Sequence, residues 1–121
     1  ERANREAAEI DYINLHGTSS RANDLIEGQL ISELFPGTTQ CSSTKAWMGH
    51  TLGAAGITEA IIAMDTLNTN IIPGSKNLET LDEALSLSIK ASDEHKVCQH
   101  VMTNSFGFGG NNCTLLFSRS E

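Results

Sequence analysis

The sequence predicts an α/β fold in which helices cover a mixed β-sheet. Runs rich in β-forming residues alternate with helical patterns in the first part of the chain, an order typical of strands joined by helices. The last two such runs are joined by the segment FGFGGN, which is typical of a hairpin. A chain of 121 residues with 39% hydrophobic content can form one domain with its own core. We therefore expect a single domain over residues 1–121.

The first two elements are a strand and a helix. The apolar run IDYINL (10–15) predicts a buried strand that stops at His16. A helix is expected over 24–34, with Asp24 as its N-cap and Glu27 as the N3 partner, and a Pro-Gly pair follows it. Its apolar face would consist of Ile26, Leu30, Ile31 and Leu34.

The middle of the chain predicts a short strand and a second, longer helix. QCSS (40–43) is the strand, and a loop over 45–50 follows it. The helix is expected over 52–67, where Gly and Ala in the first turns permit close packing. We expect this helix to be largely buried because apolar residues cover much of its circumference: Ile57, Ala60, Ile61, Met64 and Leu67.

The remaining elements are short. IIPGSKN (71–77) indicates a turn or an extended link, and LETLDEAL (78–85) indicates a short helical turn. Two late strands are expected over 97–105 and 112–118. The opening segment, 1–10, is charged and Ala-rich and lacks an initiator Met, so we expect a fragment that begins near the end of a helix.

Charge and cysteine content restrict the function classes. The net charge is −7 and the eight basic residues are scattered, which argues against nucleic-acid binding. The sequence contains no apolar run of transmembrane length and no signal peptide pattern. Cys41, Cys98 and Cys113 form an odd set with no CxxC spacing. Free buried thiols in a reducing compartment are the simpler interpretation, so we expect a cytoplasmic protein without membrane contact.

Three motifs carry residues suited to chemistry, and each also has a purely structural interpretation. FGFGGNN contains glycines that serve any hairpin turn. It is not a dinucleotide fingerprint, because Asn112 replaces the last glycine and the segment lies between strands. Two aromatic side chains, Phe106 and Phe108, stand in this flexible segment. Exposed aromatic rings are costly unless they cover something, so a movable gate over a pocket is the functional alternative.

The motif HGTSS places a histidine at the carboxyl end of a buried strand. Open α/β sheets bind ligands at this end, and the hydroxyls of Thr18 and Ser20 follow His16 at alternate positions. Taken alone, the motif favours a structural histidine in a Ser/Thr turn over a catalytic one.

The motif TKAWMGH places Lys45 and His50 just before a helix begins. A helix N-terminus favours a neutral imidazole and stabilises developing negative charge. Glu59 stands among apolar residues of that helix and could pair with Lys45 in the interior. The structural alternative is a pair of surface charges of little energetic value.

A metal site at HKVCQH is not expected. Cys98 and His100 share one face of a strand and His95 lies on the other. No second cluster supplies further ligands.

Together, DYINLHGTSS, SSTKAWMGHTLGAAG and NSFGFGGNN closely resemble the C-terminal half of β-ketoacyl-acyl-carrier-protein synthases. The resemblance runs from about Ile10 to Phe117. It implies the thiolase-like fold, in which two similar halves pack as α-β-α-β-α layers and dimerise. It also implies decarboxylative condensation of an acyl thioester with malonyl-carrier protein in fatty acid or polyketide synthesis. The partners would be acyl carrier protein, the missing N-terminal half and a second copy of the enzyme.

The resemblance assigns roles to the motif residues. His16 and His50 match the imidazole pair that stabilises the enolate oxygen, and Lys45 matches a lysine that orders the site, with Glu59 as its acidic partner. Three further matches concern substrate access. Thr18 and Ser20 correspond to hydroxyls that contact phosphopantetheine, with Phe106 beside them, and Phe108 corresponds to a gating residue whose N–H helps form an oxyanion hole. We expect no cofactor, because phosphopantetheine belongs to the substrate carrier.

Some features depart from the family or extend it. Ser20 and Asn111 stand where the family commonly has threonine. Some members hold a structural monovalent cation, and the matching positions here can all offer oxygen: Asn14, Glu59, Thr103 and Asn112. Apart from this cation, no metal is expected.

The family's nucleophilic cysteine belongs to the N-terminal half, and none of the three cysteines here occupies its motif. The isolated chain is therefore expected to be inactive. A non-catalytic partner subunit, similar to a chain-length factor, remains the alternative, although His16, Lys45 and His50 argue against it. A ketoacyl-CoA thiolase is less favoured, because its C-terminal half supplies a cysteine in a glycine-rich loop and FGFGGNN has none.

Overall fold

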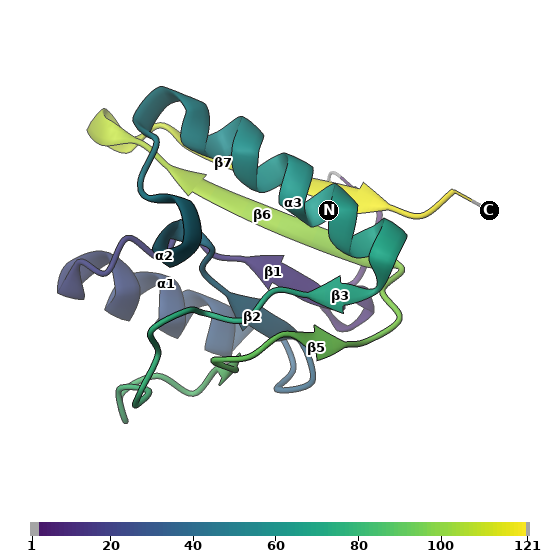
Figure 1. The fold of residues 1–121 in the computed structure, drawn as a ribbon, viewed down its shortest axis with the longest axis horizontal. Coiled ribbons are helices and arrows are strands. Elements are labelled where there is room, and N and C mark those ends of the chain that lie inside the picture. Colours follow the sequence, from purple (N-terminus) through teal and green to yellow (C-terminus); the bar gives the residue numbers. More distant parts are fainter. Residues whose placement is uncertain (1–2, 121) are drawn as a thin grey trace.

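A five-stranded mixed β-sheet forms the centre of the molecule (Figure 1). The computed structural model describes residues 3–120. The sheet has the strand order β4-β2-β1-β6-β7. Its strands are β1 (Tyr12–Asn14), β2 (Gln40–Ser42), β4 (Ser88–Ile89), β6 (His100–Phe106) and β7 (Asn112–Ser118). A separate two-stranded ribbon pairs β3 (Ile71–Ile72) with β5 (Glu94–His95).

Three α-helices accompany the sheet: α1 (Arg21–Leu34), α2 (Lys45–Met48) and α3 (Ala55–Thr69). Three single turns of 3-10 helix are also present: η1 (Ala7–Glu9), η2 (Leu52–Ala54) and η3 (Phe108–Gly110). Figure 1 shows α3 lying along β6. Within residues 3–120, no helix is long and apolar enough to cross a membrane.

The strand directions confirm the mixed sheet expected from the sequence. β1 runs parallel to both of its neighbours, β2 and β6, and β2 runs parallel to β4. Only β7 is antiparallel, because the tight turn after β6 returns the chain as a hairpin. The carboxyl ends of β1, β2 and β6 therefore meet at one edge of the sheet.

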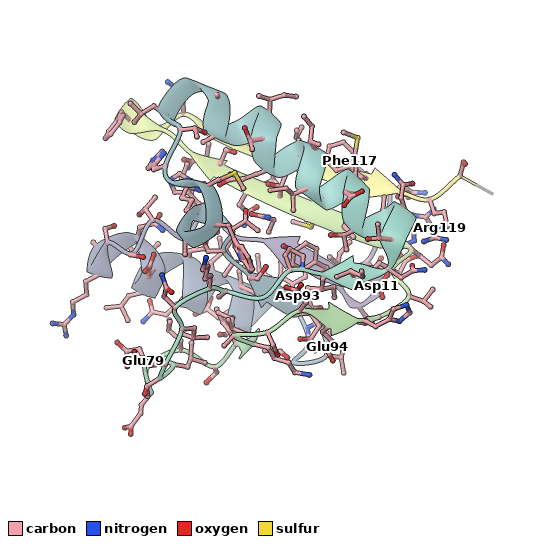
Figure 2. The ribbon with its side chains drawn as sticks, viewed as in Figure 1. Asp11, Glu79, Asp93, Glu94, Phe117 and Arg119 are labelled. Atoms are coloured by element: carbon pink, nitrogen blue, oxygen red, sulfur yellow. The ribbon has the colours of Figure 1, made fainter. Side chains whose placement is uncertain are left out.

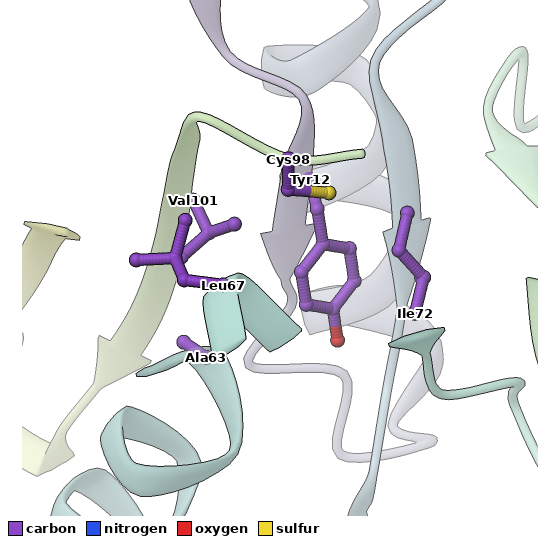
Figure 3. Close-up of a cluster of buried hydrophobic side chains, with 6 residues drawn as sticks. All are labelled: Tyr12, Ala63, Leu67, Ile72, Cys98 and Val101. Carbon is purple, nitrogen blue, oxygen red and sulfur yellow. The ribbon is translucent and has the colours of Figure 1, made fainter. Parts of the chain in front are cut away.

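Two apolar clusters fill the space on either side of the sheet. One joins α3 to the sheet and consists of Tyr12, Ala63, Leu67, Ile72, Cys98 and Val101 (Figure 3). The other lies on the α1 side and consists of Ile10, Ile13, Leu15, Ile31 and Cys41. β1 contributes to both clusters because successive side chains of a strand point to opposite faces.

A polar cap closes the C-terminal end of α3. Arg119 lies beside this end (Figure 2) and donates to the carbonyl of Leu67 and, at 2.8 Å, to the side-chain oxygen of Asn70. Asn70 adopts a left-handed conformation with φ of 58°, which ends the helix in the manner typical of a C-terminal cap.

Several sequence predictions about element boundaries are wrong in detail. α1 begins at Arg21, with Ser20 rather than Asp24 as its N-cap. The predicted loop after β2 contains the short helix α2. Segment 78–85 forms no regular helix, and the strand predicted from 97 begins at His100. The sequence predicts the end of a helix in segment 1–10. Residues 1–2 lie outside the described part of the chain, and the segment contains a single 3-10 turn, η1, at Ala7–Glu9.

The predicted apolar faces of the helices are only partly buried. On α1, Ile31 is buried, whereas Ile26, Leu30 and Leu34 are exposed. On α3, the expectation of a largely buried helix is also wrong. Ala60 and Leu67 are buried, but three larger residues face outward: Ile57, Ile61 and Met64. Amphipathic spacing predicts that a face is apolar, but it does not specify what covers that face.

Candidate active site

The sheet topology brings two sequence motifs together. In register, Asn14 at the end of β1 lies beside Ser42 at the end of β2. His16 follows the first strand by two residues and Lys45 follows the second by three. Because parallel strands end at the same edge of a sheet, both motifs project into one region. The third motif arrives there with the carboxyl end of β6.

The turn at His16 is held by hydrogen bonds to its backbone. Glu27 Oε1 accepts from the His16 N–H at 2.9 Å, and Glu27 Oε2 accepts from the Gly17 N–H at 3.0 Å. The Ser43 hydroxyl donates to the Gly17 carbonyl at 2.7 Å. Gly17 has φ of +38°, and a Cβ there would lie 2.6 Å from Ser43 Cβ. Glycine is therefore required at this position.

The two predicted histidines face each other. Their ring centroids are 5.9 Å apart and the rings are nearly perpendicular, at 89°. His50 Nδ1 accepts a hydrogen bond from the Leu52 N–H at 3.2 Å. A neutral imidazole has one protonated nitrogen, so the proton of His50 resides on Nε2, which is free to donate to a ligand.

His16 is the more enclosed histidine of the pair, with 8% of its surface exposed. Burial lowers its pKa below 6.5, and the positive charge of Lys45 and the neighbouring His50 lower it further. His16 is consequently neutral at pH 7. Within residues 3–120 its Nδ1 is buried without a hydrogen-bond partner.

Lys45 and Glu59 form the buried ion pair that the sequence predicted. Lys45 begins α2, Glu59 lies on α3, and their side chains bond directly. Glu59 is 2% exposed, and burial raises the pKa of its carboxyl while the hydrogen bond and charge of Lys45 oppose the shift. The structural alternative, a pair of surface charges, is wrong, because both side chains are in the interior. Removing one partner would leave an uncompensated buried charge.

The glycine-rich hairpin supplies two aromatic side chains in different environments. The Phe106 ring lies 5.5 Å from the His16 ring. Phe108 is 94% exposed in the described chain. Gly109 and Gly110 follow it with φ of 75° and 81°, conformations that favour glycine.

A cavity of about 640 Å³ brings most of the predicted residues together. Its lining includes six of them: His16, Thr18, Ser20, His50, Phe106 and Phe108. The Thr18 hydroxyl donates to the Ser20 hydroxyl at 3.2 Å. Lys45 instead lines a second cavity of about 470 Å³, which His50 and Thr18 also border.

The candidate cation ligands contain unpaired oxygen atoms. Among the described residues, Asn14 Oδ1, Glu59 Oε2 and Thr103 Oγ1 are buried without a hydrogen-bond partner. Asn14 and Thr103 are neighbours in register on β1 and β6. Buried oxygens normally have a partner, so this set suits a small cation. Asn112, at the start of β7, is exposed. No cluster of three or more His, Cys, Asp or Glu residues suited to a metal is found between residues 3 and 120.

The two buried cysteines, Cys41 and Cys98, do not resemble activated nucleophiles. Burial raises the pKa of Cys41 to about 12 and that of Cys98 to about 11, and a thiol must ionise to react. Cys113 is free but exposed, so the expectation that all three thiols are buried is wrong for this residue.

Sequence reasoning missed the role of Glu27. The sequence predicts it as the N3 partner of an Asp24 cap, yet its carboxylate is 2% exposed and accepts bonds from the His16 and Gly17 amides and, at 3.1 Å, from the Asn104 side chain. One feature of the sequence indicates that Glu27 is buried. Glu27 lies four residues before the buried Ile31, and a charged side chain on the buried face of a helix needs a specific partner.

Comparisons with known proteins agree with these motifs. The family model described as "Beta-ketoacyl synthase, C-terminal domain" matches residues 1–79. The chain is 47% identical over 113 residues to 3-oxoacyl-[acyl-carrier-protein] synthase 1 of Haemophilus influenzae and 45% identical over 112 residues to the Escherichia coli enzyme of that name. Each alignment covers 91% of this chain and 28% of the relative. The chain thus spans less than a third of the length of these relatives.

Solved structures give the same result for the fold. A β-ketoacyl synthase from Burkholderia phymatum matches with a TM-score of 0.93 and 36% identity, over 98% of this chain and 30% of that chain. A ketosynthase in complex with its chain length factor, from Xenorhabdus doucetiae, matches with a TM-score of 0.91 and 39% identity, over 98% of this chain and 31% of that one. These neighbours confirm the thiolase-like fold class.

Proposed function

Because the chain belongs to the β-ketoacyl synthase family through its C-terminal domain, we propose that it is the C-terminal part of a 3-oxoacyl-[acyl-carrier-protein] synthase. This enzyme would catalyse decarboxylative condensation of an acyl thioester with malonyl-carrier protein, in fatty acid or polyketide synthesis. One observation carries the proposal: two facing imidazoles line a single cavity, beside a buried lysine–glutamate pair.

The chemical step requires a place for negative charge. When malonyl thioester loses carbon dioxide, the electron pair of the broken C–C bond moves onto the α-carbon and the thioester oxygen as an enolate. The enolate carbon then attacks the acyl thioester, and the thiolate that carried the acyl group leaves. Donors aimed at the developing oxyanion contribute about 3–4 kcal/mol each in comparable sites.

The imidazoles suit this role in their neutral form. His50 is oriented by Leu52 so that Nε2–H is the available donor. Burial and nearby positive charge keep His16 neutral, so it also has one N–H to give. We assign both histidines to the enolate oxygen. The charge of Lys45, fixed by Glu59, adds to the favourable potential around it.

The surrounding residues would bind the substrate arm and control access. The hydroxyls of Thr18 and Ser20 line the histidine cavity and would contact phosphopantetheine, with Phe106 packing beside His16. Phe108 on its glycine-rich turn would act as the gate, with its N–H in the acyl oxyanion hole. A monovalent cation would stabilise the region around Glu59. Four residues would hold it: Asn14, Glu59, Thr103 and Asn112.

The proposal includes partners that lie outside this chain. Acyl carrier protein would deliver both substrates. The N-terminal half would supply the nucleophilic cysteine, since burial raises the pKa of the Cys41 and Cys98 thiols and Cys113 does not stand in the family's nucleophile motif. We expect the full-length enzyme to be a cytoplasmic homodimer. A non-catalytic partner subunit is the weaker alternative, because such a subunit has no use for His16, Lys45 and His50 in one site.

A condensation assay tests this function. The purified full-length protein is incubated with acyl- and malonyl-carrier protein, and the β-ketoacyl product is measured by mass spectrometry. We expect product from the wild type and none from His16→Ala. Absence of product from the wild type, with product only after a second ketosynthase subunit is added, would instead support the partner-subunit alternative.

A further inference from the structure

A chain of side-chain hydrogen bonds links the hairpin strands to the His16 turn. The Thr114 hydroxyl donates to Asn104 Oδ1 at 2.9 Å, and Asn104 Nδ2 donates to Glu27 Oε1 at 3.1 Å. Glu27 in turn accepts from the His16 and Gly17 amides. We infer that Asn104, oriented by Thr114, is a positioning residue that sets the Glu27 carboxylate and thereby the place of His16. This inference rests on the proposed function of His16.

The orientation of the Asn104 amide is determined by its two partners. A hydroxyl can donate to the amide oxygen, and a carboxylate can only accept, so the NH₂ group must face Glu27. The reversed amide would place its oxygen against a carboxylate oxygen. Asn104 is 3% exposed and its bond to Glu27 is buried, so water cannot readily replace that bond.

Glu27 depends on these donors because it is a buried carboxylate outside the ion pairs formed between residues 3 and 120. It has the two backbone N–H groups and the Asn104 amide to offset the cost of burial. Asn104 shares Oε1 with the His16 amide. A shift of Asn104 therefore moves the oxygen atom that holds His16.

The position of the two residues in the fold explains why this link matters. Asn104 on β6 and Thr114 on β7 are register partners across the hairpin that also carries Phe108. Glu27 lies on α1 and bonds both to the histidine turn and to Asn104. The side chains of Thr114, Asn104 and Glu27 thus fasten the hairpin to the backbone of the His16 turn. A displacement of about 1 Å at a catalytic group can lower a rate by about 100-fold.

Thr114 offers a matched pair of variants, and its exposure makes misfolding a minor concern. Thr114→Val keeps the shape and removes the donor, whereas Thr114→Ser keeps the donor. In the full-length protein, decarboxylation of malonyl-carrier protein and acyl transfer to the cysteine are measured separately. We expect Thr114→Val to lower kcat for decarboxylation about two- to tenfold, with KM and acyl transfer unchanged. Thr114→Ser should behave as wild type.

Asn104→Asp tests the next link. This substitution removes the N–H donor and places a second carboxyl group against Glu27. Two ionised carboxylates at this distance repel each other. The expected loss of decarboxylation is about 100-fold. Equal decarboxylation rates in wild type, Thr114→Val and Asn104→Asp would overturn the inference.

Amide hydrogen exchange gives a readout that does not depend on activity. Thr114→Val should speed exchange of the His16 and Gly17 amides relative to Thr114→Ser, at equal melting temperature. Unchanged amide exchange in Thr114→Val would rule out this hydrogen-bond relay, even if the decarboxylation rates of the two variants differ. If exchange responds as expected but the wild type releases no carbon dioxide, the relay stands as a structural link and the proposed function fails.

Discussion

Replacing Glu27 by Gln is a sharp test of how the site is built, because it changes one atom of a buried group. The carboxylate accepts three N–H bonds, and the amide has only one oxygen. In its best orientation the Gln oxygen faces His16 and Asn104, and its NH₂ group opposes the Gly17 N–H. Gly17 then lacks an acceptor and its amide is pushed away.

The loss of folding stability in Glu27→Gln can be estimated from the hydrogen bonds that are lost or weakened. A buried donor without a partner costs about 1–3 kcal/mol, and each remaining bond loses about 1 kcal/mol when its acceptor becomes neutral. Relief of a buried charge offsets part of this. We expect a loss of about 2–4 kcal/mol in stability. Because His16 moves with the turn, decarboxylation should fall by about 10- to 100-fold.

The assay compares Glu27→Gln with Glu33→Gln, a substitution at an exposed position of the same helix. Melting temperature, carbon dioxide release from malonyl-carrier protein and acyl transfer are measured in the full-length protein. Acyl transfer should survive in both variants, because it does not use the enolate site. Decarboxylation by Glu27→Gln at the rate of Glu33→Gln would show that the Glu27 carboxylate does not position His16.

Three further predictions concern access, ionisation and the isolated chain. Phe108→Ala should loosen the order or acyl selectivity of the two half-reactions, because the glycines beside it permit the turn to move; half-reaction rates and selectivity equal to wild type would exclude a gate. The His16 imidazole should titrate below pH 6.5 by NMR, chiefly because it is buried, so that its contribution to stability is present above pH 6.5 and is lost as pH falls through the folded pKa; Lys45→Met should raise that pKa, and an unchanged value would contradict the smaller contribution assigned to the Lys45 charge. The isolated chain should show no condensing activity and should self-associate through exposed residues such as Ile57 and Ile61; turnover above a His16→Ala control, or a monodisperse monomer by light scattering, would contradict these expectations.

The sequence indicated the sheet and the site region because both depend on strong local signals. The run ending at His16 and the run at Asn112–Ser118 are strands in the structure. Lys45 and Glu59 were paired correctly, since an acidic residue among apolar neighbours needs a buried partner. The facing arrangement of His16 and His50 followed from the family resemblance and could not be obtained from spacing.

Other features were beyond sequence reasoning for physical reasons. β3, β4 and β5 contain two residues each, too few to show a period of alternation. The spacing of Glu27 from Asp24 fits the N3 partner of a helix cap, and only the tertiary structure shows that its carboxylate binds the His16 turn. The hydrogen bonds from Thr114 through Asn104 to Glu27 join residues far apart in sequence, so no local sequence pattern predicts them.

The proposed mechanism depends on stabilisation of the decarboxylation enolate by the paired imidazoles of His16 and His50. The most direct measurement is carbon dioxide release from malonyl-carrier protein by full-length His50→Ala, beside acyl transfer to the cysteine in the same preparation. We expect release to be abolished while acyl transfer remains measurable. Undiminished carbon dioxide release by His50→Ala would exclude this histidine from stabilising the enolate.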